Sequence, residues 1–253
     1  MRPPKIKNDI EFAPITHTVH EIFPTPLIRG ELRLDHKRVT KTCREILSRI
    51  KEIDSDPQRN YTTYFFEEHR QEMIELDWFE SFANQLKDTY VYFINKHWFR
   101  RTEHLTRHNI HLFAWVSDYA EGQHHALHNH QNTLISGTYY PLAVGDTQPI
   151  HLQSPHIQSQ YIHSFESRPI DIDMPKANAV GSPASHQSIS IFPTTGEVLM
   201  WPANILHGVD GIGHGWSPDP DREFERVAIS FNLSHQEPVE WTEQGTELSY
   251  EFL

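Results

Sequence analysis

The stretch HHALHNHQNTLISGTYYP (124–141) brings four histidines into seven residues. His128 and His130 are two positions apart, and on a β-strand such residues face the same side, so both imidazoles can reach one ion. The chain holds 19 histidines in 253 residues, so clustering alone is weak evidence for a site. We interpret His128 and His130 as candidate metal ligands, and we place His124 and His125 in the loop that leads to them.

A catalytic metal usually needs three protein ligands and open coordination positions. The best third candidate is His207 in GEVLMWPANILHGV (196–209), where an apolar strand runs into a turn and then into histidine. The third ligand would then come from a distant strand, as at the mouth of a barrel. Glu121, Asp118 and Asp210 are carboxylates that could ligate instead, although none stands at a matching spacing.

Arg226 begins an apolar, alternating run in REFERVAISFNL (222–233). An arginine at the start of a core strand is costly to bury without an anion, and a guanidinium matches the two oxygens of a carboxylate. The sequence therefore predicts an anion site at Arg226. The alternative is an internal ion pair with Glu223 or Glu225.

Two amphipathic helices are predicted before residue 109. Apolar residues recur at spacings of three and four over 35–54 and 77–96. Asp35 is the expected N-cap of the first helix, and Asp77 with Glu80 the expected capping box of the second. An edge strand is expected over 21–32, because its prolines suit an edge, and another strand over 61–66.

After about residue 109 the chain changes to short runs rich in β-branched and aromatic residues, with no helical pattern between them. This half predicts a sheet sandwich or barrel, so the fold class is mainly β with flanking helices. The stretch 145–190 predicts a long loop, and with 211–221 it is a candidate for a lid. We expect one domain over 1–253, with 1–108 packing on a core of 109–234 and with 235–253 as a C-terminal tail.

Bulk composition narrows the class of protein. A net charge of −12 disfavours non-specific binding to nucleic acid, which needs a basic face. Cys43 is the only cysteine, which excludes an internal disulfide. No apolar run of about 18 residues and no signal-peptide pattern is present, so we expect a soluble cytoplasmic protein without a membrane partner.

Taken together, three motifs resemble the 2-oxoglutarate and Fe(II)-dependent oxygenases, and most closely a bacterial and phage subgroup of them. The matching pieces are HNHQNTLISGTYYP, GEVLMWPANILHGV and ERVAISFN. The resemblance extends from about residue 22 to 233 and is strongest over 111–144 and 196–233.

That resemblance implies a double-stranded β-helix (jelly-roll, cupin-like) core. It implies Fe(II) between His128, His130 and His207, and it implies 2-oxoglutarate with its distal carboxylate on Arg226. A tyrosine hydroxyl lies near that carboxylate in the family. Tyr140 matches best, Tyr139 is the alternative, and Ser230 can add a hydrogen bond. Trp115 and Asn232 are candidates for the pocket lining or for the core.

One position departs from the wider superfamily, which usually has Asp or Glu where this chain has His130. A site of three neutral imidazoles suits Fe(II) and also Zn²⁺. The expected reaction is hydroxylation of a small-molecule or peptide substrate by O₂, with decarboxylation of 2-oxoglutarate to succinate. The alternatives are a three-histidine jelly-roll enzyme that does not use 2-oxoglutarate, and a non-enzymatic cupin-like metal or ligand sensor. The substrate and the oligomeric state are not predicted.

Overall fold

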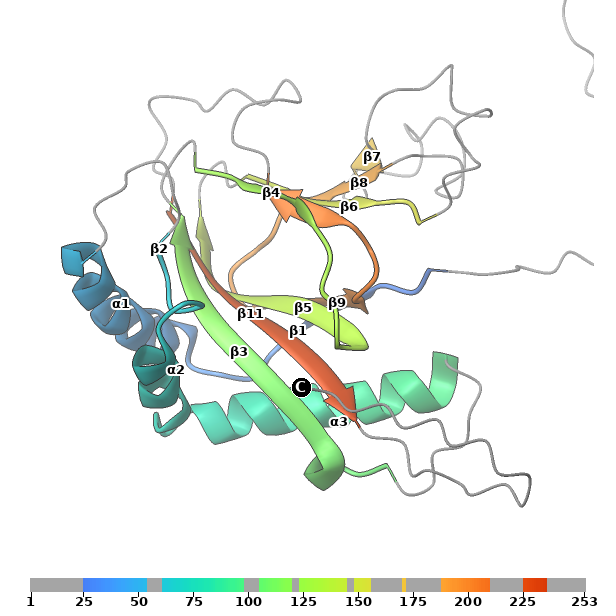
Figure 1. The fold of residues 1–253 in the computed structure, drawn as a ribbon, viewed down its shortest axis with the longest axis horizontal. Coiled ribbons are helices and arrows are strands. Elements are labelled where there is room, and N and C mark those ends of the chain that lie inside the picture. Colours follow the sequence, from blue (N-terminus) through green and yellow to red (C-terminus); the bar gives the residue numbers. More distant parts are fainter. Residues whose placement is uncertain are drawn as a thin grey trace, which may run out of the picture.

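A computed structural model describes residues 25–53, 61–97, 105–119, 123–144, 148–155, 170–171, 188–209 and 225–235. Two β-sheets face each other, and three helices cover the outer side of the larger one (Figure 1). The larger sheet runs in the order β1-β9-β5-β11-β3-β2, and the smaller one in the order β4-β10-β6-β8-β7.

The strands of the larger sheet include the longest of the described strands. They are β1 (Ile28–Glu31), β9 (Glu197–Pro202), β5 (Ile135–Val144), β11 (Glu225–His235), β3 (Ile110–Tyr119) and β2 (Tyr61–Thr62). Those of the smaller sheet are short: β4 (His125–His128), β10 (His207–Val209), β6 (Ile150–Gln153), β8 (Ser188–Ile191) and β7 (Ile170–Asp171). All neighbouring pairs are antiparallel except β7 with β8.

The connections from β3 onward identify the architecture. The chain passes from the larger sheet to the smaller at β4, returns at β5, passes over at β6, returns at β9, passes over at β10 and returns at β11. Four strands in each sheet, β9-β5-β11-β3 and β4-β10-β6-β8, therefore wind as a double-stranded β-helix, or jelly roll. The predicted fold class is confirmed.

The helices are α1 (His36–Ile53), α2 (Glu67–Ile74) and α3 (Phe79–His97), with a 3₁₀ turn η1 at Arg107–Asn109. The apolar stripes of α1 and α3 pack on one face of the larger sheet and bury one continuous core, which includes Val39, Leu47, Phe82 and Phe231. A second, smaller core around Tyr140 and Trp201 lies between the two sheets. The extent of the single domain stays a prediction.

The predicted helix over 35–54 is confirmed, and the Arg38 N–H donates to the Asp35 carboxylate at 3.1 Å, as an N-cap requires. The second predicted helix begins two residues late, because Asp77 lies in a turn and pairs with Arg38, so the predicted capping box is wrong.

Only the first two residues of the strand predicted over 61–66 are β2. The next four form a turn into α2, which the sequence did not predict. Of the edge strand predicted over 21–32, only 28–31 form a strand, β1, which does lie at the edge of the sheet. Residues 25–27 and 32 are not strand, and 21–24 lie outside the described residues. Within 145–190, the loop prediction is wrong where β6, β7 and the start of β8 form. Residues 148–149 and 154–155 lie outside strands, as predicted, and the rest of the stretch lies outside the described residues, as does 211–221. No helix in the described part of the chain is long and apolar enough to span a bilayer.

Candidate metal centre

His128 and His207 face each other across two paired strands of the smaller sheet. His128 is the last residue of β4, His207 is the first of β10, and the two are direct partners in the register. One residue further on, the register shifts by a bulge, and a Cβ on Gly208 would lie 2.7 Å from the carbonyl oxygen of His125. A glycine after His207 therefore allows the backbone of β4 to approach β10 closely.

His130 reaches the same place from the turn between β4 and β5. Its N–H donates to the carbonyl of Ala203 at 3.0 Å, which fixes the turn against the segment that precedes β10. Asn132 then takes the left-handed conformation at φ 60°, which asparagine tolerates better than most residues, and the chain turns into β5. His130 therefore has its own backbone anchor, although it lies outside a strand.

The three imidazoles form one cluster. The nitrogen atoms that could bind an ion, one each from His128, His130 and His207, lie within 4.8 Å of one another. Nitrogens bound to the same side of one ion at about 2.1 Å are about 3.0–3.4 Å apart, so ligation requires the imidazoles to move closer together by roughly 1–2 Å. The side chain of His207 is buried and the other two are half-buried, which leaves one side of the cluster open.

Hydrogen bonds fix the proton on the same ring nitrogen in two of these histidines. His128 Nδ1 donates to the Ala126 carbonyl at 2.8 Å, and His207 Nδ1 donates to the Ile205 carbonyl at 2.9 Å. A carbonyl oxygen only accepts, so Nδ1 carries the hydrogen and Nε2 keeps its lone pair in the neutral ring. Both Nε2 atoms are therefore available as metal ligands.

His130 is held by side chains. Its Nδ1 lies 2.5 Å from Asn232 Oδ1 on β11 and 3.0 Å from Ser136 Oγ on β5, and Ser136 Oγ in turn donates to Asn232 Oδ1 at 3.0 Å. Ser136 and Asn232 are register partners in the larger sheet, so two strands hold this pair in place. Nε2 of His130 is therefore also available to bind a metal, because Asn232 accepts the hydrogen bond from Nδ1.

The local environment favours neutral imidazoles. Burial, followed by the neighbouring histidines, lowers the pKa of His207 to about 3. Burial also lowers the pKa of His130, and the hydrogen bond that its ring donates to Asn232 offsets part of that shift. Neutral imidazole is the form that binds a metal, so protons compete little for these two rings at neutral pH.

Arg226 lies between the two sheets with 1% of its surface exposed. Its Nη1 donates to the carbonyl of Gln148 at 2.8 Å, and its guanidinium lies 4.8 Å and 5.1 Å from the ring centres of Tyr119 and Tyr140. Among the described residues, its Nε has no hydrogen-bond partner and no carboxylate pairs with its guanidinium. Glu225, one predicted internal partner, pairs with Arg44 instead, and Glu223 lies outside the described residues.

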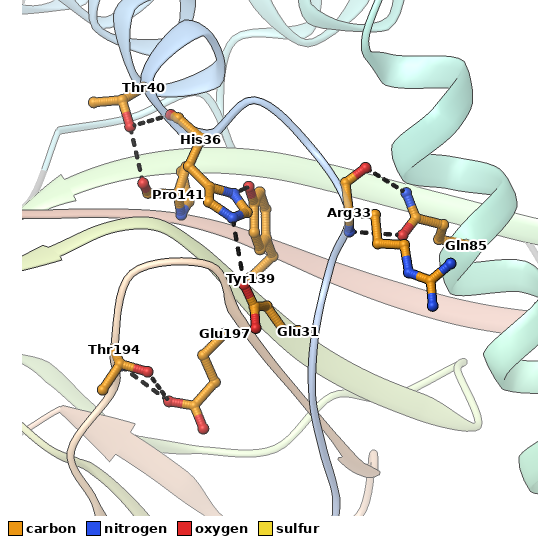
Figure 2. Close-up of polar contacts among 9 residues, drawn as sticks. All are labelled: Glu31, Arg33, His36, Thr40, Gln85, Tyr139, Pro141, Thr194 and Glu197. Carbon is orange, nitrogen blue, oxygen red and sulfur yellow. Dashed lines mark hydrogen bonds and ion pairs between the residues drawn. The ribbon is translucent and has the colours of Figure 1, made fainter.

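The two predicted tyrosines point in opposite directions, as neighbours on a strand must. The Tyr140 hydroxyl lies 3.5 Å from Arg226 Nη2, and burial raises its pKa to about 12, so it keeps its proton and can donate to an anion. The Tyr139 hydroxyl meets His36 Nδ1 at 2.6 Å on the helix side of the sheet (Figure 2). Tyr140 therefore lies beside Arg226, whereas Tyr139 lies on the opposite side of the sheet.

One small cavity connects the histidines with Arg226. It holds about 30 Å³ of free space, and Trp115, Gly137, Thr138 and Ser230 also line it. Ser230 Oγ lies 3.4 Å from Thr138 Oγ1 and faces the cavity, as its spacing from Arg226 predicts. This volume is about that of one water molecule, so a larger ligand requires the lining side chains to move apart.

Several features of the site were not predicted from the sequence. His125 belongs to β4 rather than to a leading loop, its ring stacks 4.1 Å from that of His128, and it lines the cavity. The acceptor role of Asn232 and the packing of Tyr119 on Arg226 also depend on strand register. Among the alternative carboxylates, Asp118 shares the strand face of the helix-side core residue Val116, whereas Glu121 and Asp210 lie outside the described residues.

Residues 113–232 match the protein family described as "Putative 2OG-Fe(II) oxygenase". No curated protein sequence matches the chain. The match covers β3 to β11, the strands that carry the histidine cluster and Arg226.

Similar solved structures include a prolyl-4-hydroxylase from Pseudomonas putida, with 8% identity and a TM-score of 0.46, covering 83% of this chain and 93% of that one. HygX from Streptomyces hygroscopicus with nickel and 2-oxoglutarate bound has 11% identity and a TM-score of 0.47, covering 86% of each chain. EctD from S. alaskensis has 11% identity and a TM-score of 0.49, covering 83% of this chain and 73% of that one. At these identities and TM-scores the solved structures carry no argument about function.

Proposed function

We propose that this protein is a 2-oxoglutarate/Fe(II)-dependent oxygenase in which His128, His130 and His207 hold the iron, because residues 113–232 match that family. The observation that carries this proposal is the convergence of three imidazoles with Nε2 free, next to a buried guanidinium that lacks an acidic partner among the described residues. Three nitrogen ligands on one side of an ion leave positions open for a co-substrate and for O₂.

Arg226 and Tyr140 are proposed to bind the distal carboxylate of 2-oxoglutarate. Arg226 is buried at a place where its charge needs an anion, and the Tyr140 hydroxyl beside it is a permanent donor. Ser230, on the same strand face, is proposed to add a third hydrogen bond. Tyr139 has no part in this site, because its hydroxyl bonds to His36 on the opposite side of the sheet.

When bound together, Fe(II) and 2-oxoglutarate supply the activation of O₂, with release of succinate and CO₂ and hydroxylation of a substrate C–H bond. The protein contributes orientation and a dry environment. His128, His130 and His207 present neutral nitrogens in a fixed direction, while the aromatic rings of Tyr119 and Tyr140 exclude water around Arg226.

Anaerobic titration tests the proposal. Addition of Fe(II) and then 2-oxoglutarate to the wild-type protein should give a weak visible charge-transfer band. Arg226→Met should abolish the band while the metal still binds, because only the carboxylate anchor is removed. His207→Ala should abolish stoichiometric iron.

The matched control is His111→Ala, which removes an exposed histidine on β3 and should change neither result. If calorimetry detects no binding of 2-oxoglutarate to the Fe(II)-loaded wild-type protein, the proposal is wrong. The three-histidine enzyme that does not use 2-oxoglutarate would then be the better description.

A further inference from the structure

We propose that four aromatic side chains beside the metal centre bind an extended polypeptide substrate through one of its aromatic side chains. The four are Tyr64, Phe65, Phe113 and Trp115, called here the aromatic wall. This inference rests on the proposed function, because the wall is argued to place a substrate next to the iron.

The aromatic wall is continuous with the histidine cluster. The ring of Trp115 lines the cavity and lies 5.7 Å, centre to centre, from the ring of His130. Phe113 lies two residues earlier on the same face of β3, with its ring 5.5 Å from that of Trp115. The ring of Tyr64 is 5.1 Å from Trp115 and 5.0 Å from Phe65. A path of aromatic rings therefore leads from His130 to the surface.

The outer part of this path is exposed to solvent. Phe65 is 78% exposed, Tyr64 44% and Phe113 40%, whereas Trp115 at the inner end is only 6% exposed. Exposed aromatic residues that gather in one place mark binding surfaces, and aromatic side chains are enriched where proteins bind partners. The gradient of exposure indicates a surface that receives a ligand from outside and directs it toward the metal centre.

The wall is held firmly in position. Val116 and Thr63 are joined by two hydrogen bonds, from Thr63 N–H to the Val116 carbonyl at 2.9 Å and from Val116 N–H to Thr63 Oγ1 at 3.1 Å. Arg70 of α2 donates to the carbonyls of Thr63 and Tyr64, and its guanidinium lies 5.1 Å from the ring centre of Phe113. Rigid aromatic groups lose little conformational freedom on binding, which favours affinity.

Two observations favour a polypeptide over a free small molecule or a nucleic acid. Sites for small ligands are usually concave and enclose most of the ligand, whereas Phe65 lies open on the surface. A larger molecule can lie on the wall and insert one group. The exposed Glu67 and Glu68, directly after the turn that carries Phe65, would repel phosphates and attract lysine or arginine.

A displayed library of random twelve-residue peptides tests the proposal on the metal-free protein. Selection on the wild type should enrich peptides that contain Trp, Tyr or Phe within a few positions of Lys or Arg. The affinity of a synthetic peptide from that pool should be at least about fivefold lower for the Phe65→Ala variant than for the wild type. This is the loss expected when one aromatic pair is removed. The Glu67→Gln/Glu68→Gln variant should also bind it more weakly, with a smaller dependence on salt.

Tyr92→Ala is the matched control, because Tyr92 on α3 is 57% exposed and lies on the helix layer. It should bind the peptide as the wild type does. His207→Ala should also bind the peptide as the wild type does, because the aromatic wall is intact. The peptide result therefore tests the aromatic wall even if the proposed metal site is wrong. Equal enrichment on the wild type and Phe65→Ala overturns the proposal. Tighter binding of an oligodeoxythymidine than of the peptide also overturns it. Displacement of the peptide by free indole at the same concentration as the peptide overturns it as well.

Discussion

Asn232 offers the sharpest test of how the site is built, because it accepts the hydrogen bond from His130 Nδ1 at 2.5 Å. We expect Asn232→Leu to weaken metal binding. Loss of the outer hydrogen bond of a metal-bound histidine lowers metal affinity about 10–100-fold. Ser136 Oγ remains 3.0 Å from the same nitrogen and keeps part of the orientation, so the lower end, about tenfold, is expected. Asn232→Leu with Ser136→Ala should approach about 100-fold.

The affinity is measured by calorimetric titration with Co(II), an ion that does not oxidise readily in air. Asn232→Asp should bind as tightly as the wild type or more tightly, because a carboxylate accepts the same hydrogen bond and makes the imidazole more basic. Asn109→Ala is the control, since Asn109 forms its side-chain hydrogen bonds at Thr106, on the turn before β3. A metal affinity of Asn232→Leu within twofold of the wild type would refute this account of position 130.

Three further predictions follow from the same geometry. As the pH is lowered from 6.5, the free energy of unfolding of the metal-free wild type should decrease more steeply than that of His207→Gln. The difference should reach up to about 1.4 kcal/mol per pH unit in urea titrations. His207 has a pKa of about 3 when folded, so the unfolded chain takes up its proton first. Tyr139→Phe should cost about 1 kcal/mol of stability without changing 2-oxoglutarate affinity in calorimetry, and Tyr140→Phe should mainly lower that affinity. Gly208→Ala should reduce Co(II) stoichiometry in equilibrium dialysis, because its Cβ would displace β4 from β10.

Local periodicity was sufficient to predict the first helix and the strand-rich core. Strand alternation was the reason for grouping His128 with His130, and that reason is wrong because His130 lies in the turn after β4, although both side chains join the cluster. Alternation along a strand shows that Tyr139 and Tyr140 face opposite sides, yet it does not say which side faces the site. That choice depends on α1, whose His36 bonds to one of them. The short helix α2 has only one buried residue, Met73, so it carries no apolar stripe to detect.

Partners that are distant in the sequence explain the other failures. Asp77 has the residue type and spacing of a capping residue, but Arg38 of another helix pairs with its carboxylate. The contact between Asn232 and His130 depends on the register of β5 with β11 and on the path of the turn after β4. Neither can be read from a single segment, because each is fixed only when strands about 100 residues apart are aligned.

The unequal size of the two sheets has a consequence for folding. The larger sheet has long strands and a helix layer packed on it, whereas β4 and β10 are four and three residues long. Two of the three proposed ligands are register partners in that short pair, and the third comes from the turn that follows β4. A bound ion would therefore cross-link the short pair β4 and β10 and, through His130 and its contacts with Ser136 and Asn232, connect that pair to the larger sheet. Hydrogen exchange of the backbone amides in β4 and β10 should then slow when metal is added. The fraction of molecules in which these two strands are ordered would rise with the concentration of available iron.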